Sequence, residues 1–242
     1  MDIAQIENGK SPDEPYNARL GFWLPPDSPY GNLTLKLMKL CERLDEANRR
    51  LRESWIFWDR ARQPLLSVNA LQRHVYANEQ AVYLIRRATD EIISLIWCLS
   101  EKEATGKYPE QIKVDCIGAV MAKPSDQRLA PFRRHEVLFL QLNEIANAFK
   151  HSFVNSDLTV IGRDEPSVYA LSLDRNRLSA GVQFHSIALR SLVDGFNAFY
   201  AESMAWLREF SDRNRQPGGA ASGSQPIRPE TNATSAATGS RR

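Results

Sequence analysis

The sequence has few of the features that mark a secreted or membrane-spanning protein. Its 242 residues include only three cysteines, Cys41, Cys98 and Cys116. An odd number of widely spaced cysteines excludes a full disulfide framework, and each lies in an apolar stretch, which indicates a reduced core residue. The longest apolar run, around residues 92–99, is interrupted by Ser94 and is far shorter than the roughly 20 residues of a membrane span.

The N-terminus and the overall composition also lack a targeting or charge signal. The first ten residues, MDIAQIENGK, contain no apolar run and do not resemble a secretory signal. The formal net charge of +2 is too small to indicate nucleic-acid binding by itself. Hydrophobic residues make up 43% and charged residues 25%, which is ordinary globular usage. These features predict a soluble, cytoplasmic protein.

Motifs that bind cofactors or metals are absent from the sequence. It contains no GxxxxGK[ST] phosphate loop, no GxGxxG after a strand and no GxSxG elbow. None of the four histidines follows a glutamate by three residues, the spacing that a di-iron helical bundle requires. Cysteines and histidines occur singly, so a zinc site is poorly supplied. We therefore expect no cofactor and no metal.

Changes in composition divide the chain into four parts. Residues 1–15 are polar and patternless, which predicts a disordered N-terminus. Residues 16–31 hold several prolines that forbid a regular helix, and their aromatic side chains Phe22, Trp23 and Tyr30 predict an extended arm that packs across the helices. Residues 32–214 form the predicted bundle. Residues 215–242 are rich in Gly, Ala, Ser and Thr, which predicts a disordered tail.

Apolar spacing predicts a mainly α fold. Residues recurring every three or four positions indicate long helices over 33–62, 66–103, 132–154 and 187–212, with a short crossover helix near 110–121. Alternating patterns separated by turn residues indicate short strands over 158–162, 167–173 and 178–184. The prediction is a four-helix bundle with a small antiparallel β-meander, at about 157–185, before the last helix.

Asn48 interrupts the apolar seam of the first helix, between Leu44 and Leu51. A polar residue in such a seam is expected to be buried and hydrogen-bonded, where it sets a register or an oligomeric pairing. Its replacement by leucine would then raise stability.

Polar side chains form a ladder on the helix predicted over 132–154. Asn143, Asn147 and His151 are four residues apart, with Lys150 beside them, opposite an apolar face that includes Leu138 and Leu142. One interpretation of this ladder is a simple solvated face. Asparagine disfavours helices, however, so its presence also suggests amides that have partners, either in an internal polar network or in a ligand. We expect Asn147 to join a buried network and His151 to be functional.

The segment NEIANAFKHSF, residues 143–153, resembles the conserved helix of HEPN-like bacterial bundles, many of which are RNA-cutting toxins or defence proteins. The resemblance places Asn147 at the polar position of the family motif and His151 at its catalytic histidine. Ala146 stands where the family has an arginine, which removes the cation expected to stabilise the transition state. Arg128 and His135 fit a looser form of the spacing, with Pro131 between them.

Arg133 and Arg134 form a small basic cluster and are further candidates for binding phosphate, although nearby acidic residues also fit a salt-bridged surface. The single residues His74 and His185 suit structural or surface roles. The leading hypothesis is a non-catalytic binding module that uses the polar ladder, with a protein partner or a second copy of the chain. The alternative is a HEPN-like endoribonuclease of a toxin or defence system, which binds RNA and uses His151 with an arginine from another helix or a dimer mate.

Overall fold

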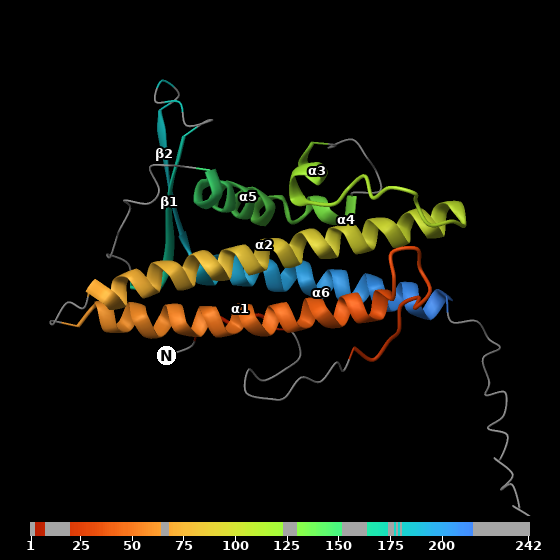
Figure 1. Ribbon diagram of the computed structural model, residues 1–242, viewed down its shortest axis with the longest axis horizontal. Coiled ribbons are helices and arrows are strands. Elements are labelled where there is room, and N and C mark those ends of the chain that lie inside the picture. Colours follow the sequence, from red (N-terminus) through yellow and green to blue (C-terminus); the bar gives the residue numbers. More distant parts are fainter. Residues whose placement is uncertain are drawn as a thin grey trace, which may run out of the picture.

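Four helices of unequal length make up most of the described part of the chain (Figure 1). The computed structural model describes residues 3–7, 20–63, 68–122, 130–151, 164–173, 177, 179 and 181–214. Its elements are α1 (Leu33–Ala61), α2 (Val68–Thr105), α3 (Ile117–Met121), α4 (Ala130–Arg133), α5 (Glu136–His151), β1 (Ser167–Leu173), β2 (Val182–Ala188) and α6 (Leu189–Asn214). The mainly α bundle with a β-element before the last helix is therefore confirmed.

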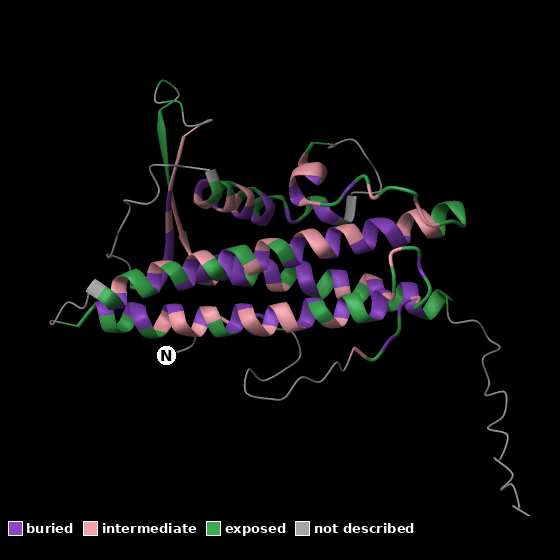
Figure 2. Ribbon diagram, in the orientation of Figure 1, coloured by how far each residue is buried: buried purple, intermediate pink, exposed green. Residues whose placement is uncertain are grey.

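The long helices α1, α2 and α6 run alongside one another, and the shorter α5 lies on α2 (Figure 1). Their buried faces point toward a common core (Figure 2). α1 begins where Asn32 accepts a hydrogen bond from the backbone N–H of Leu35. α2 ends at Thr105 and is followed by Gly106, whose φ of +75° is the left-handed conformation that glycine adopts readily. Among the described residues, no helix has the length and apolar character that crossing a membrane requires.

The helix predicted over 132–154 is divided in two. α4 ends at Arg133, and a turn through His135 separates it from α5, which is described as far as His151. At Gly195 of α6, an added Cβ atom would lie 3.3 Å from Cδ1 of Leu138 on α5. The missing side chain at Gly195 therefore lets α5 pack closely on α6.

The predicted crossover helix is much shorter than expected. Only Ile117–Met121 is helical, because the backbone N–H of Ile117 donates to the carboxylate of Asp90 on α2, which fixes the start of α3. The preceding residues are irregular, with Val114 buried and the Tyr30 hydroxyl donating to the carbonyl of Pro109.

The β-element is a two-stranded antiparallel hairpin. Ser167 pairs with Ala188 and Leu173 with Val182, so the second strand occupies 182–188 rather than the predicted 178–184. Gly181, with φ of +77°, precedes it and sets where the strand begins. The additional strand predicted over 158–162 lies outside the described residues.

The N-terminal segments differ in part from expectation. In the arm, Phe22 is buried as predicted, and Leu24 is buried as well. Trp23 is 70% exposed, because the residue between two inward side chains of an extended chain points outward. Residues 3–7 were predicted to be disordered, yet Ile6 is only 2% exposed. The tail over 215–242 lies outside the described residues.

Asn48 explains why residues 3–7 are held in place. It is 3% exposed, its Oδ1 accepts from the backbone N–H of Ile6 at 2.7 Å, and its Nδ2 donates to the Ile6 carbonyl at 3.0 Å. The prediction that Asn48 is buried and hydrogen-bonded is confirmed. Its partner, however, is the chain's own N-terminal segment. The backbone N–H and C=O of Ile6 both bond the Asn48 amide, as they would bond a neighbouring strand.

Candidate functional site

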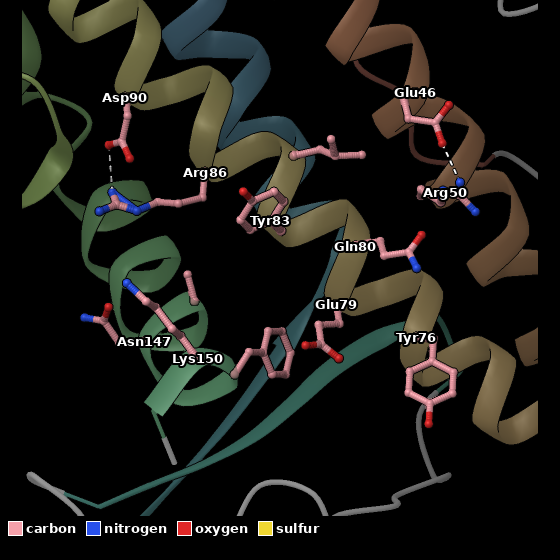
Figure 3. A pocket seen from close by; sticks show the side chains of 13 residues that line it. Glu46, Arg50, Tyr76, Glu79, Gln80, Tyr83, Arg86, Asp90, Asn147 and Lys150 are labelled. Atoms are coloured by element: carbon pink, nitrogen blue, oxygen red, sulfur yellow. Dashed lines mark hydrogen bonds and ion pairs between the residues drawn. The ribbon is translucent and has the colours of Figure 1, made fainter. Parts of the chain in front are cut away.

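An open groove of about 700 Å³ lies between α2 and α5 and reaches the edge of α1 (Figure 3). Helix α5 contributes Ala146, Asn147, Phe149 and Lys150 to its lining. Two of the sequence-predicted binding residues, Asn147 and Lys150, therefore lie in the same depression as residues of α2, and the groove is the first candidate for a functional site.

The α2 wall of the groove carries two exposed tyrosines on either side of a glutamate. Tyr76, Glu79 and Tyr83 are separated by three and four residues, which places them on one face of the helix (Figure 3). Tyr76 and Tyr83 are 60% and 59% exposed, although residues one position away, such as Ala77 and Val82, are buried in the core. The groove is therefore bordered by aromatic surface that the bundle does not bury.

Four of the charged residues in the groove form ion pairs with one another. Arg86 binds Asp90 at 3.0 Å, and Arg50 binds Glu46 at 2.6 Å, as the dashed lines in Figure 3 mark. Burial raises the pKa of Asp90, while the N–H of Ile117 and the charge of Arg86 act in the opposite direction. These four residues are already paired within the fold, so their charges need no ligand to neutralise them.

Glu79 and Lys150 are different, because neither has an ion pair or hydrogen bond to any described residue. Glu79 is half-buried, and its removal from water raises the pKa of its carboxyl group, with no cation nearby to oppose the change. Lys150 projects from α5, on the other wall of the groove, and is exposed (Figure 3). The groove thus holds one unpaired carboxylate and one unpaired ammonium on facing helices.

The amide ladder predicted on α5 is only partly assembled. Asn147 is exposed and lines the groove, so the expectation that it joins a buried network is wrong. The physical reason is that α5, which contacts α2 and α6, buries Leu142, Ile145 and Ala148 on its inner face, so that Asn147 points outward. Asn143 is half-buried and does not line the groove. His151 is the last residue of α5, and its side chain lies outside what the structure describes.

The basic cluster of Arg133 and Arg134 lies apart from the groove. Arg134 binds Glu202 of α6 at 3.2 Å, and Nε2 of the nearly buried His135 lies 2.9 Å from the other carboxylate oxygen of Glu202. Desolvation would raise the pKa of Glu202, but hydrogen bonds and charge from His135 and Arg134 lower it. Arg133 is exposed on α4. Arg134 and His135 thus join the turn after α4 to α6, and they border a smaller depression of about 310 Å³.

His74 belongs to a closed polar network at the interface of α1, α2 and β1. Its Nδ1–H donates to the carbonyl of Ser54 at 2.9 Å, and its Nε2 accepts from Nδ2 of Asn78 at 3.1 Å. Asn78 also donates to the carbonyl of Ser167 and accepts from the Ser54 hydroxyl. Burial lowers the pKa of His74 and so favours the neutral imidazole, which these hydrogen bonds require. All its members are buried, so the network is structural.

Sequence reasoning missed Tyr76, Glu79 and Tyr83. The available signal was a pair of tyrosines seven residues apart, one position beyond the apolar residues Val75 and Val82, where the helix pattern calls for polar side chains. The pairing of His135 with Glu202 gave no signal, since the two residues are 67 positions apart.

The groove is suited to binding through charge, aromatic surface and amides. No described residue of its lining is a histidine or a cysteine. Across the described ranges, no group of three or more His, Cys, Asp or Glu side chains is arranged to hold a metal ion. Comparison of this chain with protein-family models, with curated proteins and with solved structures gave no match.

Proposed function

We propose that this protein is a non-catalytic binding module whose ligand occupies the groove between α2 and α5. The observation that carries the proposal is the half-buried, unpaired carboxylate of Glu79, on the wall opposite the exposed Lys150. Partly buried charges are normally paired, because removing a charge from water costs free energy that only a partner repays. A ligand with complementary groups would supply the missing partners.

The nature of the lining favours binding over catalysis. Arg86 and Arg50 are held by Asp90 and Glu46, so they are fixed in place rather than poised for a reacting group. The tyrosines offer rigid, amphipathic surface of the kind that is enriched in recognition sites. Together these features suit a site that holds a ligand without changing it.

Selection of random peptides on the immobilised full chain tests the proposal. Ala146 is half-buried in the floor of the groove, so Ala146→Trp fills the groove without removing a charge. Peptides enriched on the wild type should lose at least tenfold in affinity for this variant. Leu140→Trp, at an exposed position of α5 outside the groove, is the matched control and should bind as the wild type does. Failure to enrich any peptide, or equal binding by Ala146→Trp, would overturn the proposal.

One observation supports a second candidate, the HEPN-like endoribonuclease. The family's arginine is replaced by Ala146, but Arg86 of α2 lines the same groove as Ala146 and Asn147. In this alternative Arg86 would stabilise the charge of the transition state, and His151 would act as general acid or base. The ion pair of Arg86 with Asp90 argues against a free catalytic cation.

Incubation with total RNA separates the two candidates. For the binding module we expect no cleavage by the wild type, and none by Ala146→Arg, which restores the arginine of the family motif. Cleavage that is lost in both His151→Ala and Arg86→Ala would establish the ribonuclease instead.

A further inference from the structure

We infer that the groove between α2 and α5 takes an extended polypeptide segment, and that a basic side chain of this segment binds Glu79 between Tyr76 and Tyr83. The inference rests on the proposed function and adds the chemistry of the ligand. It follows from the length of the groove, from the charges left unpaired in it, and from the aromatic rings that flank the carboxylate.

The length of the groove exceeds what a single small amine would fill. Its α2 wall runs from Tyr76 to Asp90. At 1.5 Å per residue, these 14 steps along the helix span about 21 Å. An extended chain advances about 3.3 Å per residue, so roughly six residues would run the length of this wall. An open, elongated depression of this kind suits a strand of polypeptide.

The carboxylate of Glu79 is the acceptor that selects a cation. Glu79 is half-buried and has no positively charged or hydrogen-bonding partner in the described part of the chain, and burial raises the pKa of its carboxyl group. An ammonium or guanidinium placed beside it would stabilise the ionised form and lower that pKa again. A charge-assisted hydrogen bond to either cation is stronger than a neutral one.

The two tyrosines strengthen the preference for a cation. Tyr76 and Tyr83 lie one turn before and one turn after Glu79 on the same face of α2 (Figure 3). The face of an aromatic ring attracts a cation within about 6 Å of its centre. The molecule already uses this contact elsewhere, since the guanidinium carbon of Arg73 lies 4.1 Å from the centre of the Phe57 ring.

The opposite wall adds a second requirement. Lys150 is unpaired and Asn147 offers an exposed amide, so α5 presents donors to the groove. An acidic side chain or the carbonyl groups of an extended backbone would accept from them. The segment therefore carries a basic residue toward α2, and its backbone or an acidic residue lies toward α5.

A positional library of acetylated, amidated hexapeptides tests the inference on the full chain. One position in each pool is fixed as lysine, arginine, glutamate or norleucine, which has nearly the shape of lysine without its charge. Binding is measured by fluorescence polarisation for the wild type, Glu79→Gln, Ala146→Trp and the control Glu110→Gln, which removes an exposed carboxylate outside the groove.

We expect the wild type and Glu110→Gln to prefer lysine and arginine pools over norleucine pools by at least tenfold. Glu79→Gln should lose this preference while still binding the norleucine pools. Binding that Ala146→Trp abolishes but that shows no dependence on Glu79 overturns the inference and leaves the proposed function standing. Binding that Ala146→Trp leaves unchanged, or no binding by any pool, overturns both.

Discussion

Asn78 and Glu79 are neighbours in α2, yet their polar groups have opposite surroundings. The amide of Asn78 is buried and makes hydrogen bonds to His74, Ser54 and Ser167. The carboxylate of Glu79 faces the groove, half-buried and without a partner among the described residues. Real proteins break the rule of satisfied polar groups mainly where they have a function. The buried face of α2 therefore supports the bundle, and the adjacent face of the same helix lines the candidate binding groove.

Breaking the closed network should give the largest effect. Asn78→Ala leaves His74 Nε2, the Ser54 hydroxyl and the Ser167 carbonyl without their partner in the interior. Each stranded polar group costs about 1–3 kcal/mol, and partial relaxation should reduce the total loss of unfolding free energy to roughly 2–4 kcal/mol. Urea denaturation measures this change. The adjacent variant Glu79→Gln is the comparison and should have an unchanged or slightly higher unfolding free energy. A similar loss of unfolding free energy in both variants would show that the two faces of α2 do not differ in their contribution to stability.

Asn48→Leu extends the comparison to α1 and should have an intermediate effect. The sequence suggested that leucine at this seam position would raise stability, but Asn48 holds both polar groups of the Ile6 backbone. Replacing it should therefore reduce the unfolding free energy by about 1–2 kcal/mol. In a chain that lacks residues 1–7, the same substitution should no longer destabilise. A stabilising effect in the full chain would mean that the N-terminal contact contributes little.

The acid side of the stability profile tests the closed network through His74. Because burial lowers its pKa below the ordinary value of 6.5, the unfolded chain binds more protons than the folded one just below pH 6.5. Stability from this residue is therefore complete above that pH and is lost as the pH falls through it. The unfolding free energy, measured by urea at several pH values between 5 and 8, should decline less steeply toward acid in His74→Gln. An unchanged slope would mean that His74 does not cause the decline.

The sequence predicted the long helices well because their apolar residues recur with one period over many turns. α1, α2 and α6 lie within two residues of the predicted bounds at each end. The start of α3 was not predictable in this way, because it depends on the Asp90 carboxylate, which lies 27 residues away in the sequence. The same holds for the attachment of residues 3–7, which depends on the distant amides of Asn48 and Asn197 and not on their own pattern.

The site was half predictable for a related reason. The helical projection of α5 correctly put Asn147 and Lys150 on one polar surface, since that step needs only the period of the helix. It could not show which helix faces that surface, so it missed Glu79 and misjudged the burial of Asn147. Arg134 does not line the groove and pairs with Glu202, which again joins distant parts of the chain.

The smallest effect on stability is expected at Asn147, where the groove and the fold can be separated most cleanly. Asn147 is exposed and has no hydrogen bond within the described residues, so Asn147→Ala should gain a few tenths of a kcal/mol from the better helix propensity of alanine. The substitution should also reduce the affinity of peptides for the groove by several-fold, since it removes a hydrogen-bond donor beside Lys150. Asn143→Ala is the matched control, on the same helix but outside the groove, and should leave binding unchanged. Denaturant melts and fluorescence polarisation on both variants measure the two properties. Loss of stability in Asn147→Ala would show that its amide supports the bundle, whereas unchanged peptide binding would remove it from the site.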